Sequence, residues 1–166
     1  MSGMYLVMIL GLMIVAPIVS VVIDYSAGGG AGDVLLLVGN WFVFWAVGVR
    51  LFTAGLSQSF RPEFTAGNIL GAKAADRSVL QIVQELGFAN LGFGLIGILS
   101  LPFAGWTVPA AVAGGLFLGL AGIRHIAKSG KNTKEWIATL TDLLVFVVLA
   151  VFVIYVWTTG AGTAVG

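Results

Sequence analysis

Four ionisable side chains stand inside stretches that are otherwise apolar: Arg50, Glu85, His125 and Asp142. If these stretches are membrane-spanning helices, the rise of about 1.5 Å per residue places Arg50, Glu85 and Asp142 about 9 to 10 Å from the same end of the bundle, and His125 within about one turn of it. A charge in hydrocarbon costs about 3 kcal/mol or more, so it normally faces the bundle interior and a partner. We therefore expect Arg50 to pair with Glu85, Asp142 or both.

Polar residues on the same helical faces extend this cluster. Gln81 precedes Glu85 by four residues, and Gln58 continues the face of Arg50. Asn90 lies nearer the middle of its segment, where an amide needs a partner inside the bundle. The candidate ligand-binding cluster therefore has six members: Arg50, Gln81, Glu85, Asn90, His125 and Asp142.

The sequence leaves two interpretations of this cluster open. In one, the ion pairs and hydrogen bonds only fix helix packing, as in a non-catalytic accessory or scaffold protein. In the other, the cluster lines a cytoplasm-facing pocket of a binding or transport-type module, with a proton, a lipid, a quinone or a small anionic molecule as the ligand. Interhelical polar contacts in membranes average less than about 1 kcal/mol, so stability alone is a weak reason to bury three charges.

Residue types disfavour several other kinds of chemistry. The chain has no cysteine, which excludes disulfides, thiolate metal ligands and CxxC redox chemistry. A metal site is disfavoured because no Glu-x-x-His spacing is present and Arg50 would repel a cation. The pattern Gly92-x-Gly94-x-x-Gly97 lies in an apolar helix without a preceding strand, unlike a dinucleotide site. We expect no catalytic residues, no metal and no cofactor, although the sequence does not exclude an enzyme.

The elements that must position these residues are five apolar stretches. Hydrophobic residues make up 59% of the chain and charged residues 9%, against about 25% charged in a soluble globular protein. Each stretch has the roughly 20 residues needed to cross a hydrocarbon core about 30 Å thick. The sequence predicts an all-α, five-span transmembrane helical bundle in a single integral membrane domain over residues 1–166, with spans at about 4–23, 34–56, 78–101, 108–127 and 136–157.

The basic residues predict how this bundle is oriented. When the five spans are threaded through a bilayer, all eight Lys and Arg residues fall on the N-terminal side, and the other side carries Asp24 and Asp33. An excess of Lys and Arg marks the cytoplasmic face. We predict a multi-pass plasma (inner) membrane protein with its N-terminus in the cytoplasm and its C-terminus outside. The start Met1–Tyr5 has no basic residue, which favours a retained span over a cleaved signal peptide. The net charge of +1 predicts no nucleic-acid partner.

Two further patterns concern packing around the spans. Pro62 followed by Glu63 suits the first turn of a helix, and Pro62–Gly71 reads as a short amphipathic interfacial helix between spans two and three, either a connector or a lid over a cavity. In the fourth span, Ala111, Gly115 and Gly119 form a small-residue ladder that lets another helix approach closely. The partner helix is either the third span of the same chain, which is also rich in glycine and which we favour, or a helix of a second protomer in a homo-oligomer.

The segments Trp41–Gln58, Arg61–Phe64, Gln84–Gly94 and Gly122–His125 resemble a family of small uncharacterised multi-pass membrane proteins from prokaryotes. The likeness runs over about residues 4–154, and its motifs include Arg50, Glu85, Asn90 and His125, with Asp142 in a less distinctive setting. The family is a domain of unknown function, so the resemblance implies a helical membrane fold and no activity. Residues 72–78 depart from the Trp- and Pro-containing stretch of the family.

Overall fold

The computed structural model describes residues 2–68, 76–127, 129–130 and 133–161, and these residues form a bundle of long helices. Five of the helices in this part of the chain are long and apolar enough to cross a membrane, and no strand is found there, which confirms the predicted five-span helical architecture. The spans run over Leu6–Ala27, Val34–Phe60, Arg77–Leu99, Ala104–Ala127 and Glu135–Thr159.

Two of these spans contain π-helical segments that divide them into shorter pieces. The first span consists of α1 (Ser2–Leu10), the π-helix η1 (Gly11–Val15) and α2 (Ala16–Ala27). The second consists of α3 (Val34–Phe42), the π-helix η2 (Val43–Val49) and α4 (Arg50–Phe60). A π-helix has more residues per turn than an α-helix, so it changes the direction in which the following residues face. The segment η2 ends directly before Arg50 and therefore sets the orientation of its side chain.

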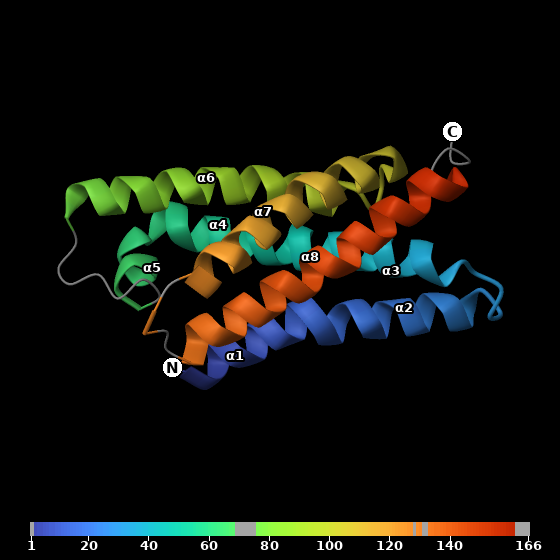
Figure 1. Ribbon diagram of the computed structural model, residues 1–166, viewed down its shortest axis with the longest axis horizontal. Coiled ribbons are helices and arrows are strands. Elements are labelled where there is room, and N and C mark those ends of the chain that lie inside the picture. Colours follow the sequence, from blue (N-terminus) through green and yellow to red (C-terminus); the bar gives the residue numbers. More distant parts are fainter. Residues whose placement is uncertain (1, 69–75, 128, 131–132, 162–166) are drawn as a thin grey trace.

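The remaining helices complete the bundle. The short helix α5 (Pro62–Asn68) follows α4, and the third span is α6 (Arg77–Leu99). A 3-10 turn, η3 (Ala104–Trp106), leads into α7 (Thr107–Ala127), and the last span is α8 (Thr133–Thr159). In Figure 1, α5 and the beginnings of α6 and α8 lie at one end of the molecule, which we call the α5 end.

Helix α6 packs along η2 and α4 of the second span, and glycines bring the backbones into direct contact. A Cβ atom added to Gly97 would lie 2.6 Å from the backbone nitrogen of Gly48, and one added to Gly87 would lie 2.7 Å from Oγ of Ser59. In a membrane, helices associate through such van der Waals packing of small residues. These contacts fix the antiparallel register of α4 against α6, so that Gly97 lies level with Gly48 and Gly87 with Ser59.

Helix α7 packs along α8, and this contact uses the small-residue ladder of the fourth span. A Cβ atom on Gly119 would lie 2.6 Å from the ring of Phe146, and one on Gly115 would lie 3.4 Å from Leu149. The close partner is therefore a helix of the same chain, as favoured, but it is the fifth span rather than the third. A homo-oligomer through this face stays a prediction.

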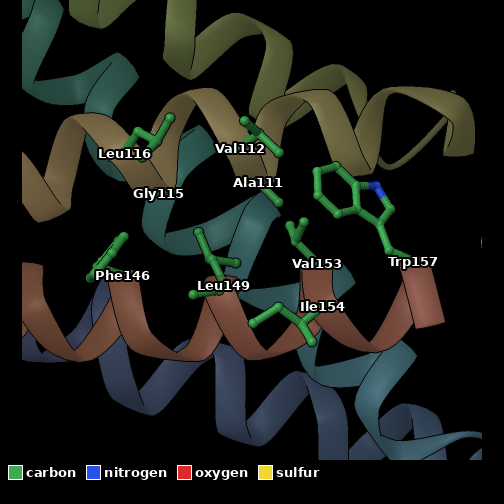
Figure 2. A pocket seen from close by; sticks show the side chains of 10 residues that line it. Ala111, Val112, Gly115, Leu116, Phe146, Leu149, Val153, Ile154 and Trp157 are labelled. Atoms are coloured by element: carbon green, nitrogen blue, oxygen red, sulfur yellow. The ribbon is translucent and has the colours of Figure 1, made fainter.

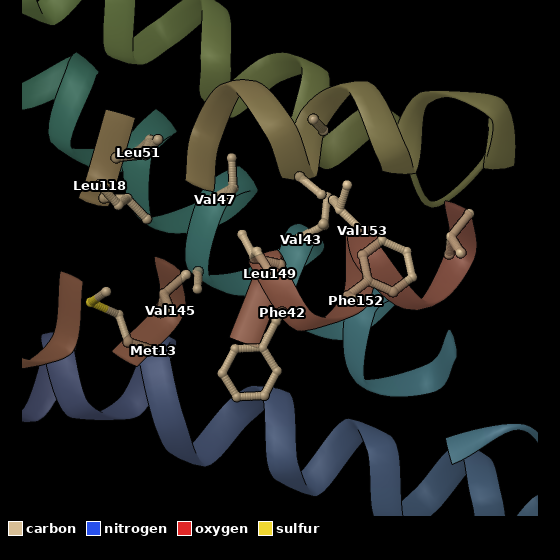
Figure 3. Packing of buried hydrophobic residues seen from close by; sticks show 14 of the residues in the cluster. Met13, Phe42, Val43, Val47, Leu51, Leu118, Val145, Leu149, Phe152 and Val153 are labelled. Carbon is tan, nitrogen blue, oxygen red and sulfur yellow. The ribbon is translucent and has the colours of Figure 1, made fainter. Parts of the chain in front are cut away.

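The apolar core lies where α3, η2, α7 and α8 meet the first span. Met13, Val43, Val47 and Val145 are completely buried, and Figure 3 shows them in one cluster with side chains from α7 and α8. The cluster joins the first, second, fourth and fifth spans, and it extends from Ile9 to Val156 near the end of α8.

The predicted interfacial helix is present as α5, which begins at Pro62 as expected and runs to Asn68. Its expected continuation to Gly71 lies outside the described residues. Pro62, Thr65 and Ala66 are buried against the bundle, whereas Phe64 and the preceding Phe60 are exposed. The helix thus has one face against the bundle at the α5 end and an apolar pair on its outer side.

The opposite end of the bundle is held by polar contacts of Asp33, which lies just before the second span. Asp33 caps α3, because its Oδ1 accepts hydrogen bonds from the backbone N–H groups of Leu35 at 3.0 Å and Leu36 at 3.2 Å. The hydroxyl of Tyr155 donates to the other oxygen, Oδ2, and so ties α8 to the start of the second span. The Tyr155 hydrogen bond, aided by the backbone ones, lowers the pKa of Asp33 below its ordinary value of 3.8.

The close approach of α4 and α6 can be tested with two glycines of α6. Gly97→Ala should lower the melting temperature in detergent, because the new methyl group overlaps the backbone of Gly48 and such overpacking costs about 1 to 3 kcal/mol. Gly92→Ala is the matched control, since a Cβ atom there has open space around it. Equal melting temperatures for the two variants, measured by circular dichroism, would contradict the register.

The Asp33–Tyr155 contact predicts an acid response. A carboxyl group whose pKa is lowered on folding stabilises the fold above its unfolded pKa, and this contribution is lost as the pH falls from about 3.8 through the lowered value. Tyr155→Phe should raise the pKa of Asp33 and reduce the loss of melting temperature between neutral pH and about pH 3. Tyr25→Phe, in the first span, should leave that loss unchanged. An unaltered acid dependence in Tyr155→Phe would refute the contact.

Candidate functional site

A buried ion pair joins the second span to the last. Nη2 of Arg50, at the start of α4, lies 2.8 Å from Oδ1 of Asp142 in α8. The two side chains are 14% and 5% exposed, so both charges have left water almost completely. The expected pairing of Arg50 with Asp142 is confirmed. It satisfies the requirement that an intramembrane charge has a partner.

The ion pair lines a cavity of about 190 Å³ near the α5 end of the bundle. Six helices contribute to its wall, and the side chains of Leu51, Phe117 and Leu118 form part of its apolar surface. Met8 and Leu86 belong to the wall and are also exposed on the outside of the bundle, so they mark the rim. The polar side chains of the wall are Arg50, Gln58, Thr65, Asn90, His125 and Asp142.

Among the described polar residues of this wall, Asn90 is the one with a buried polar atom that lacks a hydrogen-bond partner. Its Nδ2 donates to Oε1 of Gln58 at 2.7 Å, across the contact between α6 and α4. The residue is only 3% exposed, and its buried Oδ1 has no hydrogen-bond partner among the described residues. A buried polar atom left without a partner costs about 1 to 3 kcal/mol. Because Asn90 belongs to the cavity wall, a shift of its side chain toward the cavity would let this oxygen accept a hydrogen bond from a ligand.

His125 completes the set of titratable groups around the cavity. It lies in the last turn of α7, one turn beyond Ala121, and both residues belong to the wall. Within the described part of the chain, its ring makes no hydrogen bond, so both ring nitrogens are available to a ligand. The expectation that ionisable residues of the spans face the bundle interior thus holds for His125. A neutral imidazole offers one donor and one acceptor nitrogen.

Glu85 and Gln81 lie outside the cavity, contrary to the expectation that Glu85 shares the depth of Arg50. Both are exposed on α6, and Nε2 of Gln81 donates to Oε1 of Glu85 at 3.1 Å. The glycine contacts explain the difference: with Gly87 level with Ser59, Glu85 is level with Arg61. Glu85 is thus about 16 Å along the bundle from Arg50, at 1.5 Å per residue. Figure 1 shows α6 extending beyond the start of α8 at this end.

Two polar residues of the wall, Gln58 and Thr65, were not among the six candidates. Gln58 follows Arg50 by eight residues, and this helical spacing already placed it on the same face, but its partnership with Asn90 depends on the α4–α6 register. Thr65 reaches the cavity from α5, and no local pattern marks it.

Other hollows in the structure are less suited to chemistry. A groove of about 210 Å³ between α7 and α8 is lined by apolar side chains such as Leu116, Leu149 and Trp157, as Figure 2 shows. A third hollow of about 290 Å³ lies at the opposite end, and Asn40 and Thr107 are its polar residues. Neither contains an ionisable side chain. Among the described residues, no three His, Asp or Glu side chains are grouped as they would be in a metal site.

A comparison with known protein families assigns the chain to one of them. A family model matches residues 3–162, nearly its whole length. The chain belongs to DUF6790, a family of unknown function. Neither the curated proteins nor the solved structures contain a match to it. The expected membership of a domain-of-unknown-function family is thus confirmed, and what DUF6790 proteins do must be argued from the cavity itself.

The ion pair predicts a distinctive pattern of stability. Arg50→Met or Asp142→Leu alone should each destabilise the bundle by about 3 to 5 kcal/mol, because either change strands a buried charge. The double variant should regain most of that loss, since it buries no charge. Glu85→Gln is the control and should melt like the parent, because Glu85 is exposed. Strictly additive losses in detergent melting experiments would show that the two side chains do not depend on each other.

Proposed function

We propose that this protein is a membrane-embedded binding module that takes up a small polar ligand in the cavity around Arg50 and Asp142. The observation that carries the proposal is Asn90, which belongs to the wall of the same cavity and whose buried Oδ1 has no hydrogen-bond partner in the part of the chain that the structure describes. Buried polar groups in proteins are nearly always hydrogen-bonded, and exceptions often mark a missing ligand or water.

The ion pair alone does not require a cavity. If Arg50 and Asp142 served only to hold α4 against α8, apolar side chains packed around them would stabilise the bundle further. Instead, an open volume of about 190 Å³ adjoins the pair and reaches His125 and Asn90. A partly satisfied polar group beside empty space is costly for a purely structural element and useful for a binding site.

The alternative is an accessory or scaffold protein in which the ion pair only fixes helix packing. The observation that favours this alternative is the Arg50–Asp142 ion pair, because the pair connects two spans that are far apart in sequence. On this alternative, the cavity is dry or holds only water, and its residues can be replaced without loss of any activity in the cell.

We further propose that the cavity opens toward the cytoplasm and that the protein lies in the plasma membrane. Arg61, Arg77 and Arg124 are exposed around the α5 end, and basic residues mark the cytoplasmic side of membrane proteins. Thr65 of α5 belongs to the cavity wall, which places α5 beside the route from that side.

The absence of cysteine from the chain allows a direct test of this hydrated cavity. Ala121→Cys, in the cavity wall, should react with a small, charged, membrane-impermeant methanethiosulfonate reagent, because the reactive thiolate forms only where water reaches. Labelling should occur in inside-out vesicles and be much slower in right-side-out vesicles.

Two variants calibrate the reaction. Ala46→Cys lies in the core with no exposed surface and should stay unlabelled, whereas Ser129→Cys is exposed at the α5 end and should react from the same side as Ala121→Cys. If Ala121→Cys is as inert as Ala46→Cys from both sides, the cavity is dry and the binding function is excluded. Reaction of Ser129→Cys only in right-side-out vesicles would reverse the orientation.

A further inference from the structure

We infer that the ligand of this cavity is a small organic acid with an apolar body about the size of a benzene ring, whose carboxylate binds Arg50 and whose proton is taken up by His125. The inference rests on the proposed binding function and names the chemical class of the ligand. It follows from the unused hydrogen-bonding groups, the charge balance and the volume of the cavity.

Most N–H donors of the Arg50 side chain make no hydrogen bond within the described part of the chain. A guanidinium carries five N–H groups in a fixed fork, which suits two parallel hydrogen bonds to a carboxylate. Arg50 makes one hydrogen bond in the described part of the chain, from Nη2 to Oδ1 of Asp142. It also belongs to the cavity wall, so the rest of its fork is available to a second carboxylate.

The charge balance explains why a proton must accompany that carboxylate. The charges of Arg50 and Asp142 cancel, and the other described wall residues, from α1, α5 and α6 as well as α7, include one further titratable group, His125. An anion added alone would leave an uncompensated negative charge in a buried site, which is strongly unfavourable. When His125 becomes an imidazolium, the cavity holds two positive and two negative charges and stays neutral.

The proton step needs no other reactant. The O–H bond of the acid breaks, an N–H bond forms at a ring nitrogen of His125, and the carboxylate that remains bonds to Arg50. The free imidazole nitrogen acts as the base. From outside, the event is uptake of one neutral acid molecule, or equally of its anion together with one proton from the solvent.

The size of the cavity limits the body of the acid. An engineered protein cavity of about 150 Å³ binds benzene, so about 190 Å³ accommodates a ring with a carboxyl group. Leu51, Phe117 and Leu118 supply the apolar wall for such a ring. The oxygen of Asn90 is left to accept a hydrogen bond from a water molecule or from a hydroxyl group on the ring.

The test is calorimetric titration of the full-length protein in detergent with benzoate, benzamide and benzylamine, which share one ring and differ in charge. The titrations are run at about pH 8, where an ordinary histidine is neutral, in two buffers with different ionisation enthalpies. Benzoate should bind with uptake of about one proton. Benzamide and benzylamine should bind at least about tenfold more weakly, because neither carries a negative charge that can pair with Arg50.

Variants test the two roles separately, namely carboxylate binding by Arg50 and proton uptake by His125. The double variant Arg50→Gln with Asp142→Asn keeps a hydrogen-bonded neutral pair in place of the ion pair, and it should lose benzoate binding by at least about tenfold. His125→Gln should bind benzoate more weakly and without proton uptake. Glu85→Gln, which lies outside the cavity, should bind benzoate like the parent.

The outcomes separate this inference from the proposed function. Benzoate binding without proton uptake would overturn the role of His125, and equal or tighter binding of benzamide or benzylamine would overturn the acid class while leaving a ligand-binding cavity. If none of the three binds although Ala121→Cys is reactive, the acid class is wrong and the cavity is still a hydrated site. If none binds and Ala121→Cys is inert, both proposals fail together.

Discussion

The direct backbone contact of α6 with the second span, along η2 and α4, is the constraint on which the rest of the polar architecture depends. Helices in a membrane gain little from hydrophobic burial, so close packing of glycines is a main source of their association. The contact of Gly48 with Gly97 permits a single register. That register brings Asn90 to Gln58 and moves Glu85 away from Arg50 to the end of the bundle. The composition of the cavity is therefore decided by glycines that do not line it.

At the α5 end of the bundle, the Arg50–Asp142 ion pair connects two pairs of closely packed helices. The pair α4–α6 and the pair α7–α8 are each held by glycine contacts along their length. Across them, near the middle of the bundle, Val47 of η2 fills the space above Gly114. Nearer the α5 end this tight packing gives way to the cavity, and the Arg50–Asp142 bond spans it from one pair to the other. A ligand that engages Arg50 would therefore act on the joint between the two pairs.

Much of this arrangement could be predicted from sequence because it depends on periodicity within one helix. The five spans follow from runs of apolar residues, and the face that Arg50 shares with Gln58 follows from helical spacing. The depth of Glu85 could not be predicted, because counting from the end of a hydrophobic stretch assumes that all helices end at one level. Helix α6 continues past the start of α8, and only the packing of α6 on α4 reveals this. The contribution of Thr65 from α5 depends likewise on tertiary contact.

The π-helical segment η2 holds about one residue more than an α-helix would need for the same rotation of the chain. An α-helix turns the chain by about 100° per residue and a π-helix by less, so the seven residues Val43–Val49 wound as a regular α-helix would rotate α4 relative to α3 by roughly 100°. The polar edge of α4 would then turn away from α8, although every side chain of the cavity would still be encoded. Deleting one residue from this stretch would offset that rotation, so a family member with a one-position gap here would keep the cavity only if the stretch were a regular α-helix.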